Sequence, residues 1–283
     1  MLPMQATRLD QFGFLAIRGK DAHKFLQGYT TCDLDHLSNN SALFGAICNL
    51  QGRMVTNFRI CNLEDGLLLR LNRNLVEKTR TFLAKYIVFS KAEMSDMSEN
   101  YTCYGVIGDT AISEPMAVNE IGKLADNILL KISETGPRYE IWAQNPVQCE
   151  LLDDDSWRRA EIEEGFAWVD QLNAEEFIPQ MFDYHNLGGI DFDKGCYLGQ
   201  EIIARLEYRG ALNRKLHRGT AIAQLKPGEN LFSEAGKSIG VVVSAAAMEG
   251  GQILLAVLQN KSGDNIQVRA ENGDKILFSP ASQ

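Results

Sequence analysis

Short runs in which apolar residues alternate with polar ones, broken by glycine, asparagine and aspartate, dominate this sequence and predict a protein built mainly of β-strands. In the first half of the chain the predicted strands cover residues 12–18, 42–49, 54–61, 67–71, 87–92, 101–107, 128–132 and 139–142. The Asp65-Gly66 dipeptide supplies turn chemistry between the third and fourth of these strands. Residues 54–71 therefore predict a β-hairpin.

Apolar residues at helical spacing interrupt the strand pattern in four places. The predicted helices cover residues 21–27, 75–85, 155–164 and a run that begins at Gln200. Asn74 is the predicted N-cap of the second helix, and Gly165 stands where a glycine commonly ends a helix. The segment 42–142 therefore predicts a sheet with helices on one side, and the chain as a whole predicts an α+β fold.

Helical spacing disappears beyond Arg214. The predicted strands there cover residues 216–223, 238–244, 253–258, 266–269 and 276–278, separated by Gly, Asn and Asp turns. Several short strands at this spacing are typical of a small barrel or sandwich. No flexible linker precedes the segment, so we expect it to pack tightly on the rest of the chain.

The composition is that of a globular protein without a membrane segment. A chain of 283 residues with 45% hydrophobic residues can bury a large core and form two or three units. The longest uncharged apolar stretch, residues 239–248, is too short to span a bilayer. The first residues match neither a secretion signal nor a transit peptide, so we expect a cytoplasmic protein.

The charge balance argues against a protein whose main task is to bind nucleic acid. The net charge is −9 and the isoelectric point is near 5.1, whereas affinity for a phosphate backbone usually needs a basic face. A basic run at residues 205–218 is the one place where a local contact with tRNA is expected. A pure tRNA-binding module is therefore disfavoured.

One of the six cysteines differs from the others in its surroundings. The cysteines are widely scattered, without a C-x-x-C pair or zinc-ligand spacing, which predicts no disulfide, no metal site and no ferredoxin-type cluster. Cys196 lies in the octapeptide Lys194-Gly-Cys-Tyr-Leu-Gly-Gln-Glu201, beside glycines that permit a sharp turn. A neighbouring lysine and a helix N-terminus both favour the thiolate. A cysteine that merely fills space in a turn is the alternative.

The octapeptide belongs to a longer series of motifs. Besides it, the series comprises Phe25-Leu-Gln-Gly28, Asn49-Leu-Gln-Gly-Arg-Met54, Tyr86-Ile-Val-Phe-Ser-Lys91, Phe177-Ile-Pro-Gln180, Leu187-Gly-Gly-Ile190 and Ala204-Arg205 followed by Arg209-Gly210. Through these motifs, which span most of the first 220 residues, the chain resembles the YgfZ family of folate-binding proteins associated with tRNA modification.

The resemblance implies a fold related to the glycine-cleavage aminomethyltransferase, in which three units form a ring around a central folate site. Residues 1–41 and 144–213 would form a discontinuous N-terminal folate-binding unit. Residues 42–143 would form a ferredoxin-like α+β unit, and residues 214–283 a C-terminal β-barrel. The first 40 or so residues should then pack with the stretch from residue 157 to residue 209.

The same resemblance implies the site residues. Tetrahydrofolate or a derivative would be the cofactor, with Phe12, Trp157 and Asn57 as folate-binding positions. Cys196 would be the functional thiol, assisted by Lys194, Gln200 and Glu201. Aminomethyltransferases carry paired aspartates where this chain has Thr56-Asn57, and an amide cannot accept a proton as a carboxylate does. The resemblance therefore does not imply an active glycine-cleavage transferase.

The residues and the resemblance together lead to three hypotheses about function. The leading hypothesis is a folate-binding accessory protein that supports iron–sulfur enzymes, such as radical tRNA methylthiotransferases, in assembly or repair, with Cys196 essential. Cys196 would ligate a cluster, form a mixed disulfide or react with a one-carbon unit, and the sequence does not choose among these roles. The alternative is a folate-dependent one-carbon transferase on an unknown substrate, with Asp183 and His185 as the nearest acid–base residues. A cysteine hydrolase that pairs Cys196 with His185 ranks last, since no nucleophile motif is present.

Overall fold

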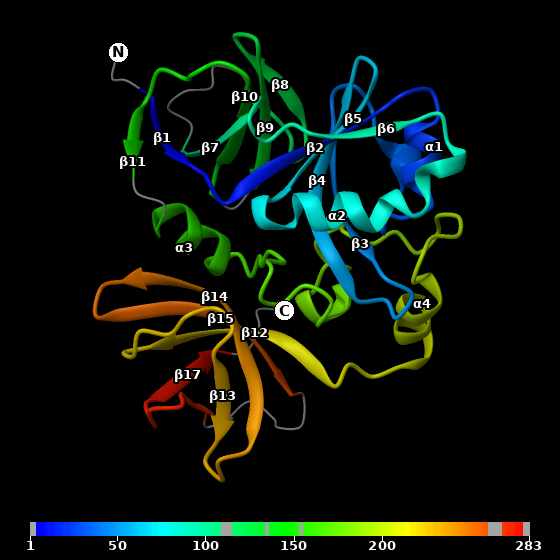
Figure 1. The fold of residues 1–283 in the computed structure, drawn as a ribbon. Coiled ribbons are helices and arrows are strands. Elements are labelled where there is room, and N and C mark those ends of the chain that lie inside the picture. The colour runs from blue at the N-terminus through cyan, green and yellow to red at the C-terminus, as the bar shows by residue number, and fades with distance from the viewer. Residues whose placement is uncertain (1–3, 109–114, 134–135, 153–154, 260–267, 280–283) are drawn as a thin grey trace.

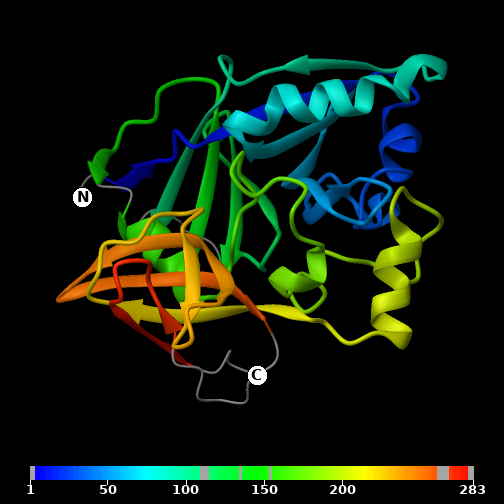
Figure 2. The same cartoon turned by 60° about the horizontal axis from the view of Figure 1, so that its bottom comes forward.

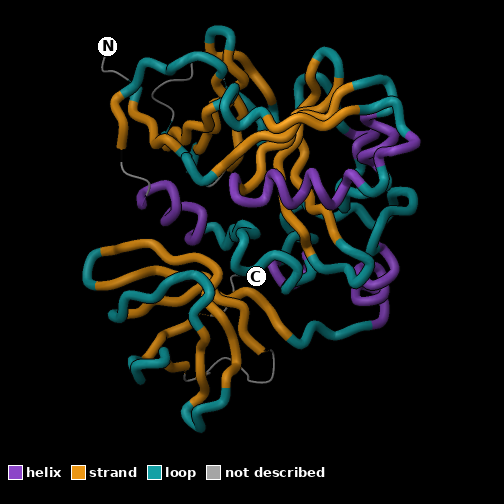
Figure 3. The backbone as a smooth tube through the Cα atoms, in the orientation of Figure 1, coloured by secondary structure: helices purple, strands orange, loops and turns teal. Residues whose placement is uncertain are grey.

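Two open sheets and a closed barrel make up the computed structural model, which describes residues 4–108, 115–133, 136–152, 155–259 and 268–279. Strands outweigh helices throughout, as Figure 3 shows. The predicted α+β class is confirmed. None of the described helices is long and apolar enough to cross a membrane.

The first sheet is antiparallel and has the strand order β3-β4-β5-β2-β6 (Figure 1). Its strands are β2 (Phe12–Arg18), β3 (Ala42–Cys48), β4 (Met54–Leu63), β5 (Gly66–Asn72) and β6 (Glu93–Asp96). The predicted hairpin is present, since β4 and β5 pair from Phe58 opposite Leu71 to Leu63 opposite Gly66. Helices α1 (Ala22–Gln27) and α2 (Val76–Ala84) contact this sheet.

The second sheet has the order β11-β1-β7-β10-β9-β8. Its strands are β1 (Gln5–Arg8), β7 (Thr102–Ile107), β8 (Ile121–Leu124), β9 (Asn127–Ser133), β10 (Arg138–Ala143) and β11 (Glu150–Leu152). One apolar cluster joins Phe14 and Leu68 of the first sheet to Leu130 and Trp142 of the second, so the two sheets share a core. The range 42–143 thus contributes strands to both sheets, and β1 leads directly into β2.

The predicted C-terminal barrel is confirmed. It closes in the order β12-β15-β14-β13-β16-β17. Its strands are β12 (Arg214–Ala221), β13 (Asn230–Ser233), β14 (Ser238–Met248), β15 (Gly251–Gln259), β16 (Val268–Arg269) and β17 (Lys275–Ser279). Residues 266 and 267, which open one predicted strand, lie outside the described residues. The helix α3 (Asp155–Glu163) contacts β14 and so joins the barrel to the sheets (Figure 2).

Long loops between α3 and the barrel carry the 3-10 helix η4 (Pro179–Phe182) and the helix α4 (Gln200–Arg209), which begins at the predicted residue. These loops pack on the N-terminal segment, as expected. Thr31 Oγ1 donates to the carbonyl of Gly189 at 2.6 Å, and the Asp191 amide donates to the carbonyl of Thr31 at 2.8 Å.

Two local predictions were wrong. Residues 87–92 do not form a strand, because Ile87–Phe89 close a 3-10 turn (η3) and leave Val88 and Phe89 70% and 99% exposed, with no sheet to bury them. Asn74 does not cap α2. The cap residue is Leu75, since the 3-10 helix η2 (Arg73–Leu75) precedes α2 and has Asn72 as its own N-cap. A further 3-10 helix, η1, covers Leu34–His36.

Candidate functional site

The octapeptide presents its thiol to solvent. Cys196 is exposed, whereas Cys32, Cys48, Cys61 and Cys103 are buried. Burial raises the pKa of the buried thiols, that of Cys32 to about 12, so they stay protonated and unreactive. Cys196 is therefore the described cysteine that a partner or reagent can reach most readily.

Lys194 points away from solvent, into the N-terminal segment. Its Nζ donates to the carbonyls of Gln27 at 3.0 Å, Thr30 at 2.7 Å and Cys32 at 2.7 Å. Burial lowers the pKa of this ammonium group. No described interaction joins it to the Cys196 thiol, so in this structure Lys194 fastens the loop to the N-terminal segment.

Gly199 joins the octapeptide to another motif of the series. It is the N-cap of α4 with φ of 85°, and a Cβ there would lie 2.5 Å from the carbonyl oxygen of Asn49. Gln200 and Glu201 form the first turn of the helix, with Glu201 exposed. Cys196 lies three positions before the N-cap (199 − 196), so it sits on the loop rather than on the helix.

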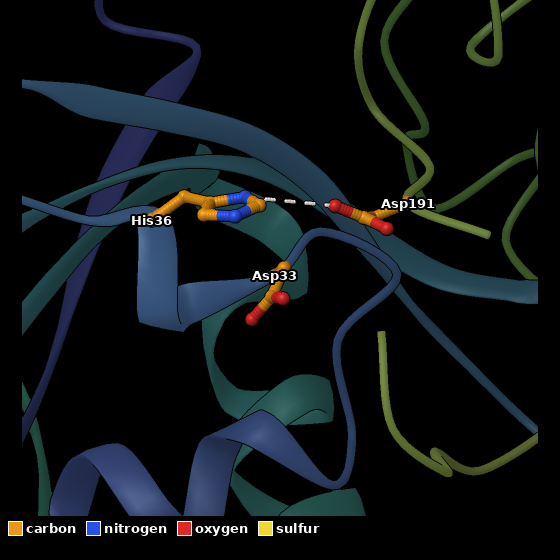
Figure 4. A group of neighbouring side chains, drawn as sticks. All are labelled: Asp33, His36 and Asp191. Atoms are coloured by element: carbon orange, nitrogen blue, oxygen red, sulfur yellow. Dashed lines mark ion pairs between the residues drawn. The ribbon is translucent and has the colours of Figure 1, made fainter. Parts of the chain in front are cut away.

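Asp33, His36 and Asp191 gather beside this loop (Figure 4). One ligand atom from each lies within 4.8 Å of the others, and His36 Nδ1 is 3.6 Å from Asp191 Oδ2. Asp191 Oδ1 accepts the amide of Lys194 at 3.0 Å, and the Asp33 carboxylate points away from the His36–Asp191 pair. These three side chains could hold a cation, but the hydrogen bonds that they make serve to shape the loop.

A cavity of about 520 Å³, here called the Phe166 cavity, opens between the two sheets and the loops that follow α3. Its lining includes Phe44, Arg59, Ser133, Glu164, Phe166 and Leu187. The guanidinium of Arg59 stands 5.8 Å from the ring centre of Phe44 and 5.4 Å from that of Phe166. The cavity thus offers aromatic walls beside a cation, which suits a flat polar ligand.

A buried charge cluster lies beside this cavity. Arg70 donates to Glu140 through Nε at 3.0 Å and also through Nη2, and both side chains are fully buried. The guanidinium of Arg70 is 3.9 Å from the ring centre of Phe12 and 4.1 Å from that of Trp168. Burial alone would raise the pKa of Glu140, but Arg70 and Arg59 hold it below its ordinary value.

Four donors around this cluster have no hydrogen-bond partner among the described residues. They are Arg59 Nε, Arg70 Nη1, Arg138 Nη1 and Trp157 Nε1. Burial lowers the pKa of Arg59 to about 10. A buried donor without a partner costs about 1–3 kcal/mol. Of the four residues only Arg59 lines the Phe166 cavity, and its Nε lies 3.7 Å from Glu140 Oε1.

The residues predicted to bind folate lie around the cluster but do not line the cavity. Phe12 is 3% exposed and meets Trp168 edge to face at 5.1 Å. Trp157 is fully buried, with Arg138 5.1 Å from its ring centre. Asn57 is also buried, donates to Tyr184 Oη at 2.7 Å and accepts the amide of Val169 at 2.9 Å.

Six of the seven predicted site residues therefore fall into two groups. Phe12 and Trp157 belong to one apolar cluster, next to the Phe166 cavity. Cys196, Lys194, Gln200 and Glu201 belong to the loop and first turn of α4. Asn57 lies apart from both groups, bonded to Tyr184 and Val169. Figures 1 and 2 show α3, which carries Trp157, and α4 on opposite sides of the molecule.

Sequence analysis missed Arg59, Arg70, Glu161, Phe166 and Trp168. Glu161 Oε1 accepts the indole N–H of Trp168 at 2.9 Å, and burial raises the pKa of this carboxyl. One signal was available for Arg70, which is the single polar residue of the predicted strand 67–71. A buried charge in such a strand requires a partner or a ligand.

A second cavity, of about 330 Å³ and here called the His217 cavity, lies between η4 and β12. Its lining includes Gln180, Asp183, His185, Lys215, His217 and Arg218, and it shares Glu164 and Leu187 with the Phe166 cavity. Burial, with a smaller effect of the Lys215 charge, lowers the pKa of His217.

His185 does not meet the exposed thiol. Its Nε2 lies 3.4 Å from Asp183 Oδ1, at the wall of the His217 cavity. Cys196 does not line that cavity, and no interaction between His185 and Cys196 occurs within the part of the chain that the structure describes. The arrangement gives no support to a cysteine hydrolase.

Comparison with known proteins finds relatives along nearly the whole chain, although no family model matches it. The tRNA-modifying protein YgfZ of Shigella boydii serotype 18 is 32% identical to this chain, and the match covers 92% of this chain and 86% of that protein. The YgfZ protein of an Escherichia coli strain matches with the same identity and coverage. The YgfZ protein of Sodalis glossinidius is 29% identical and covers 99% of this chain and 93% of that protein.

Among solved structures, the glycine cleavage system aminomethyltransferase T of Bartonella henselae is similar with a TM-score of 0.76. The likeness covers 99% of this chain and 86% of that chain at 13% identity, which shows a common fold. The predicted aminomethyltransferase-like fold is therefore confirmed.

Proposed function

The chain belongs to the family of tRNA-modifying proteins named YgfZ, and on that premise we propose that it is a folate-binding accessory protein for tRNA modification in the cytoplasm. The relatives' name supports the role in tRNA modification. The role is that of an accessory because the acidic chain, with net charge −9, is a poor general binder of RNA.

The observation that carries the folate assignment is the aromatic cavity with the guanidinium of Arg59 in its wall. A pterin ring is flat and bears several acceptor atoms, so it matches the walls of Phe44 and Phe166 and the guanidinium of Arg59, which lies beside both rings. Tetrahydrofolate or a derivative, when bound, would supply a carrier for a one-carbon unit. Phe12 and Trp157 would support the site from behind, as Phe12 does by packing on Arg70.

Cys196 would act on a partner protein rather than on the folate. It is exposed on the loop before α4, away from α3 and the cavity that α3 adjoins. An exposed thiol can ligate a cluster or form a mixed disulfide with such a partner. Iron–sulfur enzymes such as radical tRNA methylthiotransferases are the partners that we propose, with Gln200 and Glu201 beside the contact.

A cellular experiment tests this proposal. The gene is deleted, methylthiolated tRNA nucleosides are quantified by mass spectrometry, and the strain is complemented with the wild type, Cys196→Ala or Cys149→Ala. We expect the nucleosides to fall on deletion and to return with the wild type and with Cys149→Ala, since Cys149 is only partly exposed and lies outside the motifs. Normal levels after deletion, or full rescue by Cys196→Ala, would refute the role of the thiol.

A binding experiment tests the folate site separately. Tetrahydrofolate is titrated into the purified protein while tryptophan fluorescence is recorded. Phe166→Ala should weaken binding about tenfold, the scale of one lost aromatic contact, whereas Cys196→Ala should bind as the wild type does. Equal loss of affinity in both variants would contradict a folate site separate from the thiol.

The alternative, a folate-dependent one-carbon transferase, has one observation in its favour. The Asp183–His185 pair lines a cavity that shares a wall with the Phe166 cavity. Turnover of methylene-tetrahydrofolate by the purified protein would favour the transferase, and binding without turnover would favour the accessory role.

A further inference from the structure

The motif at residues 86–91 holds two apolar side chains in solvent. Val88 is 70% and Phe89 99% exposed. Their backbone is fixed in a hydrogen-bonded turn, since the Ser90 amide donates to the carbonyl of Ile87 at 2.8 Å. The folding of this chain alone therefore leaves both side chains uncovered.

A cavity of about 360 Å³, here called the Tyr29 cavity, lies beside this turn. Its lining includes Lys24, Phe25, Gly28, Tyr29, Tyr86 and Phe89. The ring centre of Tyr29 is 4.9 Å from that of Tyr86 and 5.1 Å from that of Phe25. Val88 and the residues that line the cavity form one area, here called the Phe89 surface. A contiguous exposed apolar area is typical of an interaction site.

The Phe89 surface adjoins the loop that carries the exposed thiol. Gly28 lines the Tyr29 cavity, and its carbonyl accepts the amide of Leu198, a residue of the octapeptide, at 3.0 Å. Figures 1 and 2 both show α1, which contributes Lys24 and Phe25 to the cavity, and α4 along the same edge of the molecule. A protein that contacts Cys196 therefore reaches the Phe89 surface as well.

Positive charge gathers in the segments that form this surface. Residues 20–29 and 85–91 contain four exposed lysines, Lys20, Lys24, Lys85 and Lys91, and one acid, Asp21. None of these lysines forms an ion pair with an acid that the structure describes. Asp21 is engaged, because its Oδ2 accepts the Lys91 amide at 2.7 Å. In a chain of net charge −9, this local excess of cations favours an acidic partner.

Lysines beside aromatic rings also suit single-stranded RNA, whose bases stack on such rings. Two features favour a protein instead. Val88 has no flat face on which a base could stack, and the rings of Tyr29 and Tyr86 already contact each other. An apolar side chain of a protein segment covers both kinds of residue at once.

We propose that the Phe89 surface docks an acidic segment of the protein on which Cys196 acts. An apolar side chain of that segment enters the Tyr29 cavity, and its carboxylates face Lys24 and Lys91. The inference rests on the proposed function, in which that protein is an iron–sulfur enzyme, and it adds where the enzyme binds and through what chemistry. Docking is separate from the reaction of the thiol, so it can be removed while Cys196 is left intact.

Crosslinking from the surface tests this inference. Phe89 is replaced by the photoreactive amino acid benzoylphenylalanine in the full-length protein, the cells are irradiated, and the crosslinked peptide is sequenced by mass spectrometry. We expect a peptide of an iron–sulfur enzyme with Asp or Glu beside the crosslink. Ile222 is the matched control position, because it is 86% exposed directly after β12 of the barrel, and it should not give this adduct.

The enzyme identified in this way is then purified and titrated with variants of the protein. Phe89→Ser should weaken binding at least about tenfold, the scale of one truncated anchor residue, and Lys24→Glu about fivefold in low salt, with a smaller effect in high salt. Ile222→Ser and Lys237→Glu, at exposed positions of the barrel, should bind as the wild type does. Because Phe89 is almost fully exposed, Phe89→Ser should unfold at the same urea concentration as the wild type.

Complementation separates this inference from the proposed function. In the deletion strain, Phe89→Ser should restore less than about a third of the methylthiolated nucleosides, and Ile222→Ser all of them. Full rescue by Phe89→Ser, no adduct from position 89, or an adduct with RNA or with a second copy of this chain would overturn the docking surface and leave the proposed function standing. Normal nucleosides after deletion would refute the proposed function, and the crosslink alone would then decide whether an acidic protein segment binds here.

Discussion

Lys194 shows how a single buried cation shapes the loop that carries the exposed thiol. Its ammonium group satisfies the carbonyls of Gln27, Thr30 and Cys32. Lys194→Met keeps the length of the side chain but leaves those acceptors without a donor. We expect the free energy of unfolding to fall by about 2 kcal/mol, measured by urea denaturation.

The control for this variant is Lys20→Met, which changes the same charge at an exposed position and should alter stability by less than about 0.5 kcal/mol. A Lys194→Met protein as stable as the wild type would show that the three hydrogen bonds contribute little.

Glu161 gives a prediction with a defined pH dependence. Burial raises the pKa of its carboxyl in the folded protein, so the folded state binds its proton more tightly than the unfolded chain does. The stability associated with this group is fully present below the unfolded pKa of about 4.3 and is lost as pH rises through the folded value. Glu161→Gln does not titrate and can still accept the Trp168 N–H, so it should be more stable than the wild type at pH 8.

The excess stability of Glu161→Gln over the wild type should become smaller as pH falls toward 4.5. Urea denaturation at pH 8 and at pH 4.5 measures the free energy of unfolding of each protein, and Glu163→Gln, at an exposed position, is the control. A difference that is constant with pH, or greater at low pH, would contradict the raised pKa of Glu161.

At the scale of elements, the start of α4 depends on a close approach to the turn at Asn49. Gly199 has φ of 85°, and a Cβ there would lie 2.5 Å from the Asn49 carbonyl oxygen and 3.2 Å from Gly52 Cα. Gly199→Ala should destabilise the protein by about 2–4 kcal/mol, since strain in the left-handed region adds to a clash with backbone that cannot move easily.

Substitutions at two other glycines distinguish the effect of backbone strain from the effect of the clash. A Cβ at Gly236 meets nothing within 4 Å although φ is 74°, so Gly236→Ala should show only the backbone strain of about 1–2 kcal/mol. Gly195 also meets nothing and lacks the positive φ, so Gly195→Ala should be nearly neutral. Chemical denaturation of the three variants would contradict the account if Gly199→Ala were no worse than Gly236→Ala.

Elements were predictable from sequence where local chemistry decides them. The turn at Asp65-Gly66 and the helix that begins at Gln200 each depend on neighbours in the chain, and both are present. Residues 87–89 were not predictable in this way. Their β-branched and aromatic residues favour a strand, but strands need a pairing partner, and the chain turns back here instead.

At the scale of the whole molecule, the loop with Cys196 was readable from sequence whereas the buried charge cluster was not. The glycines that expose Cys196 are its neighbours. Arg70 and Glu140 are 70 residues apart, and only the packing of two sheets brings them together. Sequence marked Arg70 as a charge in an apolar strand but could not name its partner.

The Arg70–Glu140 pair provides the corresponding prediction, because it joins β5 of the first sheet to β10 of the second. Glu140→Gln removes the negative charge and leaves Arg70 and Arg59 buried without neutralisation. We expect a loss of about 3–5 kcal/mol in the free energy of unfolding, measured by urea denaturation. The double variant Arg70→Met, Glu140→Gln should lose at least about 1 kcal/mol less stability than the losses of the two single variants added together.

Acid gives an independent check on this pair. Arg70 and Arg59 outweigh burial and hold the pKa of Glu140 below its ordinary value, so the stability from its charge is present above about pH 4.3 and is lost as pH falls through the folded value. The difference in the free energy of unfolding between the wild type and Glu140→Gln should therefore become smaller in acid.

The control is Asp10→Asn, which breaks the exposed pair with Arg8 and should lower the free energy of unfolding by less than about 0.5 kcal/mol at neutral pH. Equal losses for Asp10→Asn and Glu140→Gln would mean that the buried pair does not hold the two sheets together.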